Sequence, residues 1–65
     1  MATIIDFTKD HSIKVKELRE LLANIPEKFD ECIVESDGCD CVGDAVGLEV
    51  YEYESGQVVL ILKRR

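Results

Sequence analysis

Residues 45–63, AVGLEVYEYESGQVVLILK, contain the pattern that decides the fold. Over 45–53, apolar side chains alternate with Glu and Tyr, which is the period of a half-buried strand. Residues 54–56 form a short loop, with Gly56 at the position where a positive φ is needed. Residues 57–63 supply a returning strand, so the stretch predicts a β-hairpin.

An amphipathic helix is predicted upstream of this hairpin. Ser12 is a candidate N-cap, and Pro26 ends the helix because the residue before a proline is disfavoured in helical φ/ψ. We therefore expect the helix to run from about residue 13 or 14 to 24. Its apolar residues recur every three or four positions, at Val15, Leu18, Leu21, Leu22 and Ile25.

A third strand is predicted after Pro26, with a core of Cys32, Ile33 and Val34 that ends at the turn signal Asp37-Gly38. Residues 1–12 either add an edge strand over Thr3–Phe7 or form a flexible arm, because their few apolar residues do not define a register. The sequence thus predicts a single α+β domain over 1–65, in two layers. One helix packs on a small, mainly antiparallel sheet of three to four strands.

The charge balance narrows the classes of partner. Fourteen acidic and eight basic residues give a net charge of -6, which repels phosphate backbones and anionic lipid. Between residues 27 and 54, ten acidic residues face the single base Lys28. We therefore expect no direct binding to nucleic acid.

Targeting and membrane signals are weak. The longest apolar run, 58–62, has five residues, far fewer than the roughly 20 that a membrane-spanning helix needs. The N-terminus does not have the pattern of a secretory signal, and three cysteines are an odd number that argues for reduced thiols. These features predict a cytoplasmic protein without a membrane partner.

The loop at residues 37–44 invites a metal hypothesis, because it places Cys39 and Cys41 among three carboxylates. With Cys32 and His11 they would supply the four ligands of a tetrahedral zinc site. A lone Cys-x-Cys nevertheless differs from the paired knuckles of structural zinc. The alternative is a structured turn in which one cysteine packs inward, and no resident cofactor is predicted.

Catalysis is not predicted. Asp10, His11 and Ser12 are adjacent, but catalytic triads are assembled from distant segments around a pocket. A chain of 65 residues with one helix offers little concave volume for such a pocket. We expect His11 to be solvated near the start of the helix.

The last strand indicates an interaction surface. One helix covers only one face of the sheet, whereas residues 58–62 are apolar on both. Either Val59 and Ile61, or the alternate set, points away from the helix beside the tyrosines, unless the N-terminal segment covers that face. The candidate interface, for a protein partner or for a second copy in a homodimer, comprises Tyr51, Tyr53, Val58, Leu60 and Leu62.

Residues 13–62 resemble small phage and prophage proteins of uncharacterised function. The resemblance rests on Val15-Lys16-Glu17-Leu18, Leu21-Leu22, Pro26, the strand Cys32-Ile33-Val34-Glu35 and the closing hairpin. It implies a home on a mobile element of a bacterial host and no activity.

Three functions are compatible with these features. The leading hypothesis is a non-enzymatic accessory protein that binds a protein or itself through the sheet face or the acidic surface. A zinc-binding module centred on Cys39 and Cys41 is one alternative. The other is an inhibitor whose carboxylates imitate a nucleic-acid backbone, with Asp30, Glu31, Glu35 and Glu49 as candidates.

Overall fold

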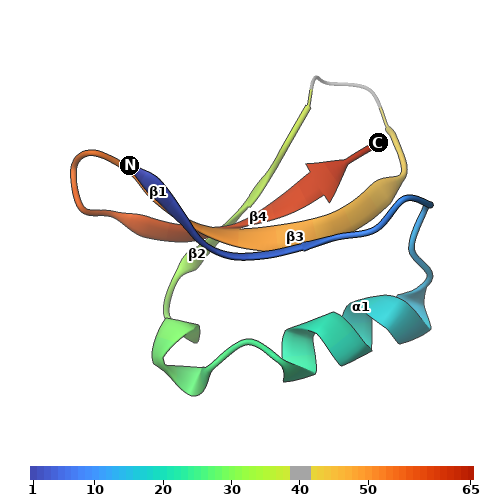
Figure 1. Ribbon diagram of the computed structural model, residues 1–65, viewed down its shortest axis with the longest axis horizontal. Coiled ribbons are helices and arrows are strands. Elements are labelled where there is room, and N and C mark those ends of the chain that lie inside the picture. The colour runs from blue at the N-terminus through green and yellow to red at the C-terminus, as the bar shows by residue number, and fades with distance from the viewer. Residues whose placement is uncertain (39–41) are drawn as a thin grey trace.

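The computed structural model describes residues 1–38 and 42–65, which form a four-stranded sheet with one helix on one face (Figure 1). This arrangement confirms the predicted two-layer α+β class. The elements in chain order are β1 (Ala2–Thr8), α1 (Val15–Ala23), the 3₁₀ helix η1 (Glu27–Phe29), β2 (Ile33–Ser36), β3 (Ala45–Glu52) and β4 (Val58–Arg64).

The strand order is β1-β3-β4-β2. β3 pairs antiparallel with both β1 and β4, and β2 pairs parallel with β4. Consequently β1, β2 and β4 run in the same direction, and α1 connects two parallel strands at opposite edges of the sheet. The hairpin β3–β4 fills the space between them, so the fold is a split β-α-β unit with an inserted hairpin. The N-terminal segment is thus an edge strand rather than a cover for the sheet.

The hairpin forms where the sequence predicts it. Glu52 pairs with Val58, and Tyr53 N donates to Gln57 O at 2.9 Å to close the loop. Gly56 has a φ of +90°, the positive value that this loop requires. A local pattern of alternation and one glycine is enough to determine this element.

The helix begins later than Ser12 predicts. Lys14 is the N-cap residue, and its backbone N–H donates to Glu17 Oε1 at 3.2 Å. The reason is tertiary: Ile13 N donates to Ala45 O at 2.8 Å, which holds the preceding residues against β3. Ser12 instead donates its hydroxyl to Asp44 Oδ2 at 2.8 Å. Neither α1 nor η1 is long and apolar enough to cross a membrane, and the described residues contain no other helix.

The core lies between α1 and the centre of the sheet. Leu21 of α1 packs against Leu48 of β3 and Leu60 of β4, and these side chains are 7%, 0% and 8% exposed. Burying each such side chain contributes roughly 1.5–3 kcal/mol. A ring of half-buried apolar residues surrounds them, namely Phe7, Ile13, Leu18, Ile25 and Leu62.

β1 and β3 approach each other most closely at Gly47. A Cβ built on Gly47 would overlap Phe7 O, which is a backbone atom and cannot rotate away. We expect Gly47→Ala to displace β1 and to lower the free energy of unfolding by roughly 1–3 kcal/mol. Urea denaturation followed by circular dichroism measures the change.

Gly56→Ser is the control, because no atom lies within 4 Å of its Cβ position and only the positive φ opposes it. It should cost about 1 kcal/mol and leave the β1 amides protected from hydrogen exchange. Equal protection of β1 in both variants would contradict the close approach at Gly47.

Candidate functional site

The two faces of the sheet differ in what covers them. Because side chains alternate along a strand, Val58 and Leu62 share the face of Leu60, which packs under α1. Tyr51 pairs with Val59, so the tyrosines lie with Val59 and Ile61 on the opposite face. The predicted interface is therefore divided between two faces. Leu60 and Leu62 belong to the core side, and only the tyrosines lie on the face away from α1, here called the open face.

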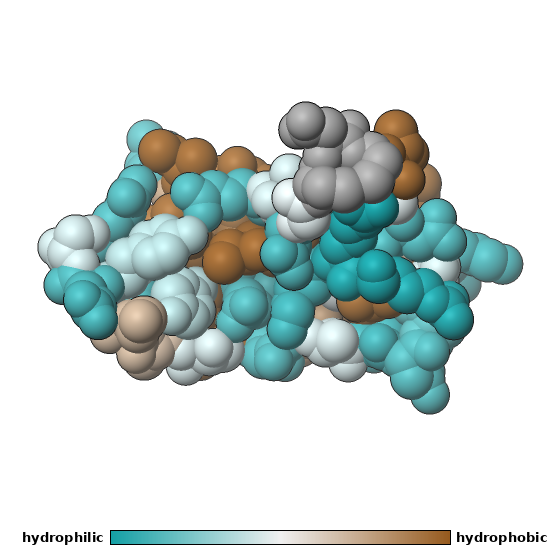
Figure 2. All heavy atoms as spheres, turned by 90° about the horizontal axis from the view of Figure 1, so that it is seen from above, coloured by the Kyte–Doolittle hydropathy of each residue, from teal (hydrophilic) through white to brown (hydrophobic). Residues whose placement is uncertain are grey.

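The open face is closed by the chain's own side chains. Val59 at its centre is 0% exposed, although α1 lies on the other side of the sheet. The rings of Tyr51 and Tyr53 meet edge to face with centroids 5.3 Å apart, and Tyr53 Oη donates to Glu35 Oε1 at 2.6 Å. This hydrogen bond to a carboxylate raises the pKa of Tyr53. Figure 2 shows apolar side chains in the middle of this face, between paler and hydrophilic ones.

Charged and polar side chains also lie on the open face. Lys63 Nζ lies 3.8 Å from Glu49 Oε1 and 3.9 Å from Asp6 Oδ2. Thr3 Oγ1 donates to Glu49 Oε2 at 2.9 Å. These groups tie β1, β3 and β4 together across the sheet. At its centre, the open face is thus covered by aromatic and polar side chains that already have partners.

Two consecutive apolar side chains are exposed on β2, an edge strand of the sheet. Ile33 and Val34 are consecutive, so they point to opposite faces of the sheet, and they are 61% and 59% exposed. Leu22 on α1 is also exposed and lines the same groove as Val34. The exposed side chains of Leu22, Ile33 and Val34, with the groove between α1, η1 and β2, are here called the β2 margin.

The groove of the β2 margin has a volume of about 240 Å³. Small-molecule sites usually span about 300–1,000 Å³, so this groove is better matched to one bulky side chain than to a metabolite. Cys32 lies in it, at the entrance to β2 rather than inside the strand. The lining residues are Leu22, Ile25, Phe29, Asp30, Cys32, Val34 and Leu60.

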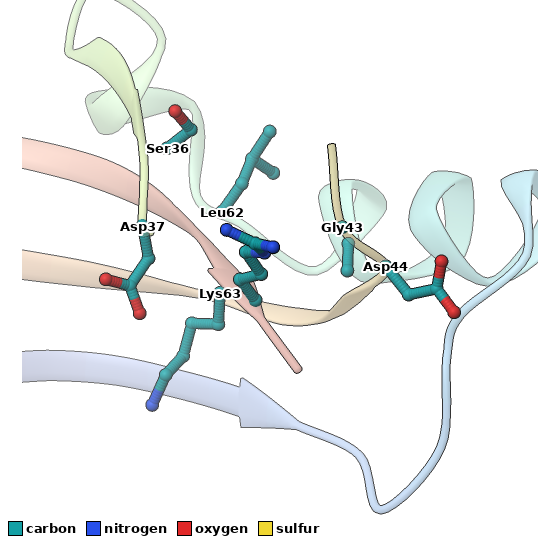
Figure 3. Close-up of a pocket in the computed structure, with 8 residues that line it drawn as sticks. Ser36, Asp37, Gly43, Asp44, Leu62 and Lys63 are labelled. Carbon is teal, nitrogen blue, oxygen red and sulfur yellow. The ribbon is translucent and has the colours of Figure 1, made fainter. Parts of the chain in front are cut away.

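A second cavity of about 180 Å³ lies at the opposite end of β2, near the C-terminus of β4 (Figure 3). Asp37 and Asp44 lie on opposite sides of it, and their carboxylates point away from one another. The side chain of Arg64 occupies the space that side chains at Gly38 and Gly43 would take. This cavity does not bring its acidic groups together for acid–base chemistry.

Two of the four predicted metal ligands, His11 and Cys32, lie within the described residues. His11 contacts Glu17 in the first turn of α1, whereas Cys32 follows η1 at the other end of the helix. Cys39 and Cys41 lie outside the described residues. Within positions 1–38 and 42–65, no group of three or more His, Cys, Asp and Glu side chains could hold a metal ion. The zinc hypothesis stays a prediction, and His11 and Cys32 do not share a site.

His11 lies between two carboxylates. Its Nδ1 is 3.0 Å from Asp10 Oδ1, and its Nε2 is 2.8 Å from Glu17 Oε2. Only the imidazolium carries protons on both nitrogens, so this arrangement raises the pKa of His11, with Glu17 as the largest cause. Ser12 bonds to Asp44 and accepts from Arg65 Nη1 at 3.2 Å. His11 and Ser12 therefore act in separate contacts, not as a nucleophile with its base.

Comparisons with known proteins leave the site to be judged on its geometry. No family model, curated protein or solved structure matches the chain.

The contacts of His11 with Asp10 and Glu17, here called the His11 clamp, predict a pH dependence of stability. The pKa of His11 in the folded state lies above its ordinary value of about 6.5. The contribution of His11 to the free energy of unfolding is therefore complete below about pH 6.5 and is lost as pH rises through the raised pKa. The pKa values of Asp10 and Glu17 are lowered by the same contacts, so their contribution is lost as pH falls through those lowered values. Melting temperatures measured across this range should decline on both sides.

The control is His11→Gln, which should remove the decline on the alkaline side. Glu17→Gln should return the pKa of His11 toward its ordinary value in an NMR titration of the imidazole, since Glu17 is the largest cause of the shift. An unshifted His11 in the wild-type protein would contradict the clamp.

Proposed function

We propose that this chain is a small, non-enzymatic accessory protein that binds another protein through the β2 margin. The observation that carries the proposal is the exposure of Ile33 and Val34, adjacent apolar residues on both faces of an edge strand. Large exposed apolar groups that cluster commonly mark interaction surfaces, whereas single ones do not. Leu22 and the groove beside Val34 extend this cluster onto α1.

The β2 margin is favoured over the centre of the open face because its apolar side chains are exposed, whereas those at the centre of the open face are already buried. Val59 is fully covered by neighbouring side chains, and the polar groups around it already have partners in Glu35, Lys63 and Thr3. Docking there would break these contacts before making new ones. Docking on Ile33 and Val34 would break no such polar contacts, since both side chains are apolar and exposed in the free chain.

A different protein is favoured over a second copy on electrostatic grounds. A two-fold contact between β2 strands would bring the same acidic residues of two chains together, and each chain carries a net charge of -6. The residues concerned are Asp30, Glu31, Glu35 and Asp37.

Imitation of a nucleic-acid backbone is the weaker proposal. Glu35 accepts from Tyr53, and Glu49 is held by Thr3 and Lys63, so two of its four candidate carboxylates are engaged inside the sheet. An origin in phage or prophage rests on the resemblance of residues 13–62, and a cytoplasmic location rests on the odd number of cysteines.

A displayed library of random peptides tests the proposal without a named partner. Binders selected on the wild-type protein should shift the amide NMR signals of Leu22, Ile33 and Val34. The double variant Ile33→Thr/Val34→Thr keeps β-branched side chains and should weaken binding by about tenfold or more, because it removes apolar surface from the contact.

Val15→Thr is the matched control, since Val15 is an exposed valine on α1 outside the β2 margin. It should leave the affinity unchanged. Binders that map to Tyr51 and Tyr53 and leave Ile33 unshifted would overturn the proposal. So would a dimer in light scattering that the double variant dissociates, because the second copy would then be the partner.

A further inference from the structure

We infer that β2 receives an extended, basic segment of the partner as a fifth strand of the sheet. This inference rests on the proposed function and names the chemistry of its partner. Addition of a strand to an exposed edge uses main-chain hydrogen bonds for affinity and alternate side chains for specificity. Three features of β2 support it: the direction of its free backbone groups, its apolar side chains and the charge around it.

The backbone of β2 has hydrogen-bonding groups that face outward. Asp37 N donates to Leu62 O at 3.0 Å, which shows that the backbone N–H of Asp37 points toward β4. Backbone groups alternate in direction along a strand that pairs in parallel, so Ile33 and Glu35 also point toward β4. The N–H and C=O groups of Val34 and Ser36 then point away from β4. No other strand of the described residues pairs with that side.

The two edges of the sheet differ in the regularity of their pairing. β1 has a register irregularity between Thr3 and Ile5. Irregularities of this kind are one means by which proteins prevent strand addition at an edge. β2 pairs without a register shift, and its two leading residues are Ile33 and Val34. Of the two edge strands, β2 is therefore the one whose regular pairing suits a further strand.

The side chains of β2 define what the added strand must present. Val34 faces the groove under α1, and Ile33 faces the opposite side beside Val59, its partner in β4. An added strand would alternate in the same way, so one bulky apolar residue would enter the groove and a neighbour would cover Ile33. Both exposed side chains of β2 would then be buried by a single segment.

The charge of the margin determines the sign of the partner. Residues 27–37 contain five acidic residues and only Lys28, whose ammonium lies 5.2 Å from the ring centroid of Phe29. Acidic groups lie at both ends of the edge, with Asp30 and Glu31 before β2 and Asp37 after it. An acidic or neutral segment would meet repulsion or no attraction here. Lys or Arg at the ends of the added strand would be attracted.

Synthetic peptides of about ten residues test the inference by fluorescence polarisation. The probe alternates Val and Thr around one central Leu and has two Lys residues at each end. We expect it to bind with an affinity that falls as salt rises, and to shift the amide signals of Val34 and Ser36. The same peptide with Glu in place of Lys should bind at least about tenfold more weakly.

Ser36→Pro removes one outward N–H without removing a bond to β4, and proline is tolerated at such edge positions. It should weaken binding of the basic peptide about tenfold, while Ser36→Ala, which keeps the N–H, should bind as wild type does. If Ser36→Pro does not fold, a basic peptide methylated at alternate backbone nitrogens takes its place on the wild-type protein and should not bind.

Equal binding of basic and acidic peptides, or binding that survives both Ser36→Pro and backbone methylation, overturns the inference. The failure of the proposed function looks different. Library binders that map to the β2 margin but are acidic or helical would leave the proposed function standing and remove the inference. Binders that map elsewhere would remove both.

Discussion

Strand β4 has apolar side chains on both faces, and both faces must be kept from water. Leu60 and Leu62 point to one side, and Val59 and Ile61 to the other. A strand of this kind is stable only at the centre of a sheet, with β3 on one side and β2 on the other. The order of the strands, the position of α1 and the composition of the open face all follow from covering β4.

The two faces are covered by different means. On one side α1 supplies Leu21 and a ring of apolar side chains, as in most two-layer folds. On the other side no helix is present among the described residues. Tyr51 and Tyr53 provide ring surface there, and Glu35, Glu49 and Lys63 pair their polar ends with each other or with neighbours. Long amphipathic side chains can cover apolar surface in this way while their polar ends stay in water.

Local pattern predicted what is local. The alternation in residues 45–53, the position of Gly56 and the helix stripe all appear in the structure at or near their expected bounds. The prediction of Ser12 as the N-cap was wrong, because a tertiary bond from Ile13 N to Ala45 O holds the preceding residues against β3. The predicted interface placed Tyr51 and Leu60 on one face, which was wrong. Alternation shows only which residues share a face within one strand. It does not show which set of the next strand lies beside them, and that is decided by the register of the hairpin.

The parallel pairing of β2 with β4 depends on residues far apart in the chain, so no local signal could reveal it. The exposure of Ile33 and Val34 follows from that pairing and was missed for the same reason.

The apolar side chains of β2 are hard to explain by the stability of the free chain. Ile33 and Val34 favour a strand through their β-branched side chains, but threonine would do so as well and would be soluble at an edge. At 61% and 59% exposure, most of their surface contributes nothing to the core. Apolar burial yields roughly 25 cal/mol per Å², and at these positions that free energy is available only when something else covers them. The centre of the open face shows that this chain can cover an apolar strand with its own polar and aromatic residues where no partner is needed. That β2 is left without such a cover, and is flanked by carboxylates, is the strongest physical argument that its cover comes from another molecule.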